Sequence, residues 1–133
     1  MESWALTSPP IVKVNQYLFF IKHKTNYMAT YYYALASQKF LLEEEPFEEV
    51  LKERRRDYAE KNKEIDFWQV IQPAFLNAPA LAEVKAKAPE KNVAIISTNK
   101  SFIVWVKLRL EYVLTGEFEA PSDTIPDPLA SLD

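Results

Sequence analysis

The sequence predicts a single α+β domain, in which a four-stranded, mainly antiparallel or mixed sheet carries about three helices packed on one face. Short β-branched and aromatic stretches alternate with amphipathic stretches, which gives the order β-α-β-α-β-α-β. The chain of 133 residues is long enough for one domain with a core. Such alternation normally suggests a doubly wound parallel sheet, but those sheets commonly hold ligands on Gly-rich crossovers, and this chain contains 1 glycine.

The chain divides into three regions. Residues 1–27 differ in character from the rest of the chain, and we interpret them as an N-terminal extension that is not native, with Met28 as the natural start. The alternative is that this region supplies an extra strand that pairs with a sheet edge. The α+β domain is expected over residues 28–120. Residues 121–133 form a tail rich in proline and aspartate, which predicts irregular backbone that packs only in part.

The first half of the domain is predicted to run strand, helix, strand. Thr30–Ala36 is apolar and rich in tyrosine, which favours a strand. Pro46 and the acids before it suit the first turn of a helix, and apolar residues recur at helical spacing from there to about Lys61. Ile65–Pro73 has apolar residues on both faces, so we expect a strand that is sandwiched or covered by something outside the chain.

The second half of the domain is predicted to continue helix, strand, helix. Asn77 is a suitable N-cap for a short helix through about Lys87. The composition of Val93–Thr98 predicts a buried strand. Asn99 can then cap a helix that begins at residue 100 and continues to about Tyr112.

The last predicted strand is Val113–Glu119, and it contains the only glycine of the chain, Gly116. A single glycine in a strand often marks a bulge or a left-handed turn, so we expect one of these at this position.

The composition excludes several classes of function. With no cysteine, the chain forms neither disulfides nor thiolate metal sites. Its only histidine, His23, lies in the extension, so we expect no catalytic triad, no cofactor and no metal site. The net charge of −3 disfavours nucleic acid as a partner, and we interpret the Arg54–Arg56 run, which lies among acids, as a solvated helix face. No apolar run approaches the roughly 20 residues that span a bilayer.

Four residues are candidates for binding a partner. Asp66 lies within an apolar strand, where an unpaired carboxylate is costly to bury. On the last helix, Arg109 falls among apolar residues, so either its stem packs while its head reaches solvent, or it shares one patch with Asp66. In that second hypothesis the two residues are paired or are both offered to a partner. Phe67 and Trp68 are either core residues or interface anchors.

Several segments of the chain resemble those of a known family. They are Tyr31–Phe40, Glu43–Pro46, Ile65–Trp68, Gln72–Phe75, Leu108–Glu111, Thr115–Asp123 and Ile125–Pro128. On these segments, which span about residues 28–130, the chain resembles the hypothetical chloroplast reading frame fifty-four family, called Low Chlorophyll Accumulation A in plants. The family occurs in cyanobacteria, algae and plants. Residues 1–27 have no counterpart in this resemblance.

The resemblance implies a non-catalytic accessory subunit of the oxidative magnesium-protoporphyrin IX monomethyl ester cyclase of chlorophyll biosynthesis. Such a subunit binds the di-iron catalytic subunit and supports its assembly, accumulation or activity. The resemblance also implies an interaction patch that includes Asp66, Phe67 and Arg109, and other chlorophyll-biosynthesis enzymes as further partners. Its implied location is the cyanobacterial cytoplasm, at the thylakoid membrane through the partner, or the chloroplast in algae and plants.

The alternative function is a carrier that presents a tetrapyrrole substrate or product on an aromatic surface. Stacking of a flat ring on tyrosine, phenylalanine or tryptophan is physically feasible. The domain offers neither histidine nor cysteine as an axial ligand for the magnesium, so we expect such binding to be weak.

Overall fold

The structure is a computed structural model of the chain, and it describes residues 28–133. The predictions for residues 1–27 lie outside the described residues. The described region contains four strands: β1 (Ala29–Ser37), β2 (Phe67–Ile71), β3 (Asn92–Ser97) and β4 (Leu114–Ala120). Its three α-helices are α2 (Glu48–Glu60), α3 (Ala82–Lys87) and α4 (Lys100–Leu110).

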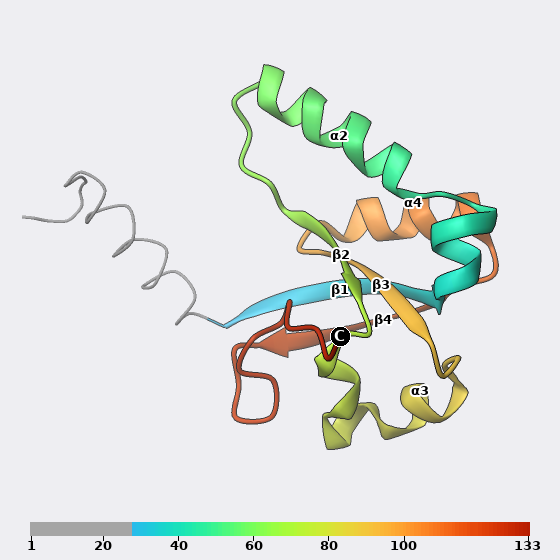
Figure 1. The fold of residues 1–133 in the computed structure, drawn as a ribbon. Coiled ribbons are helices and arrows are strands. Elements are labelled where there is room, and N and C mark those ends of the chain that lie inside the picture. The colour runs from blue at the N-terminus through green and yellow to red at the C-terminus, as the bar shows by residue number, and fades with distance from the viewer. Residues whose placement is uncertain (1–27) are drawn as a thin grey trace, which may run out of the picture.

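The strands form one sheet in the order β2-β3-β1-β4, and every neighbouring pair is antiparallel (Figure 1). The register places Ala34 of β1 between Ile95 of β3 and Thr115 of β4. The connection through α2 leads from β1 past β3 to β2, and the connection through α4 leads from β3 past β1 to β4. This is the split β-α-β arrangement of ferredoxin-like folds. The predicted α+β class and its four-stranded antiparallel sheet are therefore confirmed.

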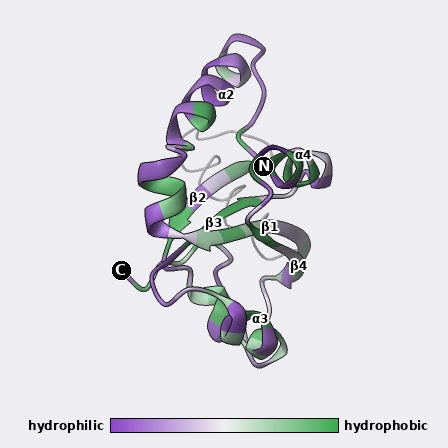
Figure 2. Cartoon of the chain, turned by 90° about the vertical axis from the view of Figure 1, so that its right-hand side faces the viewer, coloured by the Kyte–Doolittle hydropathy of each residue, from purple (hydrophilic) through white to green (hydrophobic). Residues whose placement is uncertain are grey.

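Helices cover both faces of the sheet, so the expectation that they pack on one face was wrong. One core cluster joins α2 and α4 to one face, and a second joins α3 and the chain around it to the other (Figure 1). The physical reason is that the central strand β3 is buried at all six positions, which requires cover on both sides. Figure 2 shows hydrophobic residues gathered on the central strands and hydrophilic residues along much of α2.

Some helix boundaries differ from those predicted. Residues 39–44 form a π-helical turn, η2 (Lys39–Glu44), and α2 begins only after Pro46. Asn77 ends a 3₁₀ turn, η3 (Ala74–Asn77), rather than capping a helix. The Asn99 cap is confirmed, because its Oδ1 accepts a hydrogen bond from the backbone N–H of Phe102 at 3.3 Å.

The tail returns to the end of β2. The backbone N–H of Leu132 donates to the carbonyl of Gln72 at 2.8 Å, and that of Ala74 donates to the carbonyl of Ala130 at 2.9 Å. Ile125 is buried in the core cluster on the face of the sheet that α3 covers. These contacts close the face of the sheet opposite α2 and α4.

Gly116 marks neither a bulge nor a left-handed turn. It lies within β4, opposite Tyr33 of β1, and its φ is not positive. A Cβ at this position would lie 2.4 Å from Tyr33 Oη and 2.7 Å from Tyr33 Cζ. The glycine is needed because the tyrosine ring occupies the space of a side chain.

Candidate functional site

The helices α2 and α4 border a groove on the surface of the domain. Its volume is about 320 Å³. The residues that line it are Val50, Arg54, Asn99, Ser101, Phe102 and Trp105. Among the apolar members, Phe102 is buried and Trp105 is exposed, and the polar members come from α2 and from the N-terminal end of α4.

A row of aromatic rings leads from the start of β2 to the outer side of α4. Tyr58 of α2 meets Phe67 edge-on, with ring centroids 5.2 Å apart. Phe67 lies 5.7 Å from Phe102, and Phe102 stacks on Trp105 at 5.9 Å. Strand alternation aims Phe67 at α2 and α4, and the i,i+3 spacing places Phe102 and Trp105 side by side. The row thus connects a buried strand end with an exposed helix face.

Arg54 covers this row. Its guanidinium carbon lies 3.9 Å from the ring centroid of Phe102, 5.2 Å from that of Phe67 and 5.1 Å from that of Tyr58. Its Nη2 donates to Tyr58 Oη at 3.0 Å. A guanidinium over aromatic faces is attracted by the ring quadrupoles, and more strongly where it is shielded from water.

The three arginines in the run at 54–56 have different roles. Arg55 pairs with Glu48, and Arg56 pairs with Glu53, all on the outer side of α2. The predicted solvated helix face is therefore correct for these two. The prediction was wrong for Arg54, which turns toward the sheet.

Asp66 lies directly before β2 and not within a strand as predicted, since β2 is shorter than the predicted Ile65–Pro73, and it has a partner. Its Oδ1 accepts a hydrogen bond from Tyr58 Oη at 3.0 Å. Burial raises the pKa of the Tyr58 hydroxyl, the Asp66 carboxylate raises it further, and the charge of Arg54 opposes both. Tyr58 therefore remains a neutral donor at physiological pH and joins the carboxylate to the guanidinium.

Arg109 lies on the exposed side of α4, not among apolar residues as predicted. The residues that α4 buries are Phe102, Ile103, Val106 and Leu110. The guanidinium carbon of Arg109 lies 5.6 Å from the ring centroid of Trp105, one turn earlier, which is itself 43% exposed. Arg109 therefore extends the aromatic row outward and ends it with a positive charge.

The structure brings three of the four candidate residues into one connected array. Asp66 and Phe67 stand at one end of the row and Arg109 at the other, and within residues 28–133 the acid and the arginine make no ion pair. Trp68 is not part of the array. It packs with the cluster on the opposite face, 6.3 Å from the ring of Tyr31.

Sequence reasoning missed the residues that connect this array, which are Arg54, Tyr58 and Phe102. A signal for one of them was present. Arg54 stands four residues after Val50 and four before Tyr58, so it shares their helix face.

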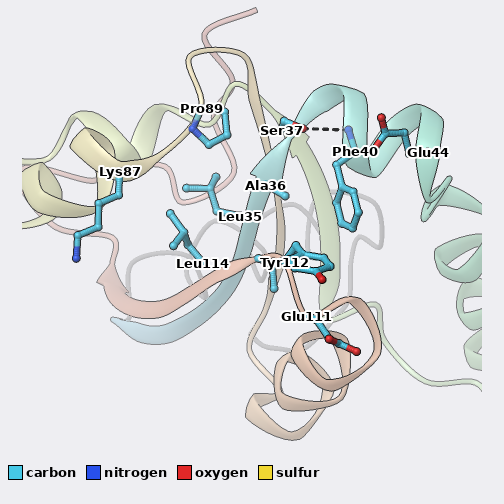
Figure 3. Close-up of a pocket in the computed structure, with 11 residues that line it drawn as sticks. Leu35, Ala36, Ser37, Phe40, Glu44, Lys87, Pro89, Glu111, Tyr112 and Leu114 are labelled. Carbon is cyan, nitrogen blue, oxygen red and sulfur yellow. Dashed lines mark hydrogen bonds between the residues drawn. The ribbon is translucent and has the colours of Figure 1, made fainter.

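A second depression lies at the other end of the sheet, with a volume of about 520 Å³. Figure 3 shows Leu35 and Leu114 in its wall, and Lys87 and Glu111 pointing in different directions. Ligand sites usually combine an apolar wall with a few convergent polar groups. The charged side chains of this depression do not converge, so it is a weaker candidate than the groove.

Residues 28–133 contain neither a candidate metal site nor a membrane-spanning helix. In that range no three or more His, Cys, Asp or Glu side chains are grouped so that they could hold a metal ion. The described helices also include none with the length and apolar character needed to cross a membrane.

The fold and the groove define a small α+β protein with a surface on which cations lie over aromatic rings. A sequence model of the Ycf54 protein matches residues 29–120, and the chain belongs to this family. The predicted family resemblance is thereby confirmed.

Relatives of the chain occur in cyanobacteria, red algae and plants. It is 93% identical over 133 residues to a Ycf54-like protein of Synechocystis sp., and this covers 100% of both chains. It is 58% identical over 92 residues to an uncharacterized protein ycf54 of Porphyra purpurea, covering 69% of this chain and 85% of that one. Its identity to the chloroplastic protein YCF54 of Arabidopsis thaliana is 44% over 103 residues, covering 76% and 46%.

Solved structures share this fold. The Ycf54 protein from Synechocystis sp. superposes with a TM-score of 0.79 at 93% identity, covering 80% of this chain and 100% of that chain. A protein from Nostoc sp. superposes with a TM-score of 0.79 at 69% identity, covering 80% and 99%.

Proposed function

We propose that this chain is a non-catalytic accessory subunit of the oxidative magnesium-protoporphyrin IX monomethyl ester cyclase. In this role it binds the di-iron catalytic subunit and supports its accumulation or activity. The family resemblance supplies the identity of the partner. The observation that carries the proposal is the exposed end of the aromatic row, where Arg109 lies over Trp105 beside the groove between α2 and α4.

The chemistry of α4 supports this assignment. Tryptophan and arginine are enriched among the residues that dominate binding energy at protein interfaces. Beside Trp105, α4 exposes Leu108 at 73% and Val104 at 48%, and a second groove of about 250 Å³ runs between this side of α4 and β4. An exposed apolar patch of this kind is typical of an interaction site.

Phe67 has a different role in the proposal from that of Arg109. It is 1% exposed, so it does not touch a partner in this conformation. Its ring contacts those of Tyr58 and Phe102, and it therefore positions the residues that form the groove. Asp66 acts in a similar way, because it holds the Tyr58 hydroxyl.

Binding to the di-iron subunit also accounts for the proposed location. The partner carries the chain to the thylakoid membrane surface, where other chlorophyll-biosynthesis enzymes become available as further partners. In this proposal the chain reaches the membrane without a membrane-spanning helix of its own.

A tetrapyrrole carrier is the second candidate. The observation that favours it is the exposed indole of Trp105, which has Arg109 over its ring and Arg54 in the same groove. A flat ring can stack on the indole while a propionate meets a guanidinium. Absorbance titration of the isolated protein with the porphyrin ester tests this candidate. Saturable micromolar binding by the isolated protein would promote it.

The test of the proposal is co-purification of the di-iron subunit with the tagged protein. The wild type is compared with Asp66→Ala, Phe67→Ala and Arg109→Ala, and circular dichroism is recorded for each. Arg56→Ala is the matched control, because Arg56 is an arginine of the outer face of α2. We expect Arg109→Ala to remain folded and to lose the partner, and the control to retain it. A folded Arg109→Ala that retains the partner would move the interface elsewhere, and a wild type that retains none would remove the accessory role.

A further inference from the structure

Arg54 makes little use of its hydrogen-bonding capacity. A guanidinium has five N–H donors, and among residues 28–133 the acceptor recorded for Arg54 is the hydroxyl of Tyr58. Its Nε is buried and has no partner among the described residues. Leaving a buried donor without a partner is costly, and more so for a charged group. The donors of this arginine that are open to a further acceptor are those on its terminal nitrogens, of which Nη2 makes the bond to Tyr58.

Ion pairs engage several of the charges near Arg54. Arg55 pairs with Glu48 and Arg56 with Glu53, and Lys61, directly after α2, pairs with Asp57. In the described part of the chain, no carboxylate forms an ion pair with Arg54. The nearby Asp66 reaches it only through Tyr58.

The groove beside Arg54 presents donors and no acid. Its polar lining consists of Arg54, Asn99 and Ser101. Asn99 uses its Oδ1 to cap α4, which leaves its amide NH₂ as a donor. The guanidinium lies over Phe102, its Nε is buried and its Nη2 donates to Tyr58, so the edge between the two terminal nitrogens is the one left for a bidentate contact. A carboxylate is the acceptor that matches such a fork.

The size of the groove indicates whether the carboxylate belongs to a protein side chain or to a tetrapyrrole. Its volume of about 320 Å³ lies at the small end of the range for ligand pockets, about 300–1,000 Å³. That space suits one acidic side chain and an apolar neighbour against Val50 and Trp105, whereas a whole tetrapyrrole needs more room. The helix α4 carries Lys100, Lys107 and Arg109 and no acid, so the α4 side of the groove is complementary to an acidic segment.

We infer that Arg54 is the receptor for an aspartate or glutamate side chain of the partner, which enters the groove between α2 and α4 together with an apolar neighbour. The inference rests on the proposed function, because it names the chemistry by which the partner is recognised. Tyr58 and Asp66 are positioning residues in this site: the carboxylate holds the hydroxyl, and the hydroxyl fixes one edge of the guanidinium.

The first test is equilibrium binding of the purified di-iron subunit, measured over a series of salt concentrations. Arg54→Gln removes the charge, Arg54→Lys keeps the charge but not the fork, and Arg56→Gln is the control on the outer face of the same helix. We expect Arg54→Gln to weaken binding at least ~30-fold throughout the salt series, since it removes one member of a desolvated charge pair, which salt screens little. The affinity of Arg54→Lys should lie between that of Arg54→Gln and that of the wild type, and the control should bind like the wild type.

A second test uses the wild-type side chain and is insensitive to misfolding of a variant. The ¹⁵N-labelled protein gives a side-chain Nη–H resonance for Arg54, which is followed as the di-iron subunit is added. We expect this resonance to shift downfield, because the terminal N–H groups acquire a carboxylate acceptor. A resonance that stays in place at saturation would overturn the inference, as would folded Arg54 variants that bind like the wild type.

The outcomes separate this inference from the proposed function. A wild type that fails to bind the di-iron subunit overturns both. Loss of binding in Arg109→Ala with normal binding in both Arg54 variants overturns the inference alone. Saturable binding of magnesium-protoporphyrin monomethyl ester that Arg54→Gln abolishes would also overturn it, because the carboxylate would then come from a small molecule.

Discussion

The two faces of the sheet carry aromatic clusters of similar size but different character. The cluster under α2 and α4, here called the charged cluster, consists of Tyr58, Phe67, Phe102 and Trp105. The cluster on the opposite face, here called the apolar cluster, consists of Tyr31, Tyr33, Phe75 and Phe118. Two guanidinium groups lie over the rings of the first, whereas the second is closed by the tail and the turns before α3.

This difference teaches that aromatic content alone does not locate a site. Both clusters come from aromatic residues at strand and helix spacing, and that pattern is typical of a core. The charged cluster differs because cations from two helices and an acid that directly precedes β2 lie beside its rings. Burying such charges is costly unless a partner compensates for the lost hydration. Trp68 illustrates the point, since it was chosen with Phe67 but belongs to the apolar face.

The largest expected effect is that of Phe75→Ala in the apolar cluster. Phe75 is buried, stacks on Phe118 at 4.5 Å and lies 5.0 Å from the ring of Tyr33. We expect the free energy of unfolding to fall by about 3–5 kcal/mol, measured by urea denaturation. The affinity per folded molecule for the di-iron subunit should be unchanged. Leu132→Ala, at an exposed position in the tail, is the control, and reduced affinity of folded Phe75→Ala would remove the functional distinction between the faces.

The next effect concerns the contact of Gly116 with Tyr33, also on the apolar face. A Cβ at 116 would meet the tyrosine ring at 2.4 to 2.7 Å, so Gly116→Ala should lower the free energy of unfolding by about 1–3 kcal/mol. Adding Tyr33→Phe removes the nearer atom, Oη, but not Cζ, and should restore part of the loss. Thr115→Ala at the neighbouring exposed position is the control. A double variant as unstable as Gly116→Ala alone would show that the hydroxyl is not the obstacle.

Much of the fold could be predicted from the sequence because its signals are local. The strands follow from β-branched and aromatic composition, and the start of α4 follows from Asn99, whose side chain accepts the predicted capping bond. The strand around Phe67 was predicted to be apolar on both sides, which is correct. The cover on the second side was not predictable, because it comes from the tail and from turns distant along the chain.

The candidate site was only partly predictable, for a similar reason. Asp66 in an apolar strand indicated a missing partner, but the partner, Tyr58, comes from the helix before it. Arg109 was placed among apolar residues because Trp105 was counted with the buried face of the helix, whereas α4 buries Phe102, Ile103, Val106 and Leu110 and leaves Trp105 43% exposed. The sequence pattern does not show which of several apolar residues on a helix faces the sheet.

A smaller effect, on both faces, comes from tyrosine ionisation. Burial raises the pKa of the Tyr33 and Tyr58 hydroxyls above the ordinary value of about 10. Each folded-state pKa is raised, so the stability that each contributes is complete below pH 10 and is lost as the pH rises through the raised pKa. We therefore expect the urea midpoint of the wild type to decrease as the pH rises above 10. In Tyr33→Phe or Tyr58→Phe the midpoint should decrease less steeply with pH.

The two tyrosines should differ at neutral pH. Tyr58→Phe removes the hydroxyl that joins Arg54 to Asp66, which should cost about 1–2 kcal/mol of stability and weaken partner binding. Tyr33→Phe should leave partner binding unchanged, because Tyr33 lies in the apolar cluster. Equal affinities of the two variants would mean that the hydroxyl of Tyr58 does not position Arg54 for binding.

The smallest expected effect on stability is that of Arg109→Gln, and it sharpens the comparison within α4 itself. Arg109 is exposed and its recorded contact is the ring of Trp105, so the free energy of unfolding should change by no more than about 0.5–1 kcal/mol. Lys107 has the same charge, but its Nζ donates to the carbonyls of Glu111 and Val113 at 3.0 and 2.9 Å. Lys107→Gln should therefore lower stability by about 1 kcal/mol.

For affinity to the di-iron subunit, the expected order of the two variants is reversed: Arg109→Gln should weaken binding more than Lys107→Gln does. Arg109→Gln removes a charge that lies over an exposed indole, and Lys107→Gln removes one that is engaged with the end of its own helix. Both change the net charge of the protein equally, so long-range attraction falls equally in both. If the two variants weaken binding to the same extent, the partner responds to the net charge of α4, and the pairing of Arg109 with Trp105 has no special role.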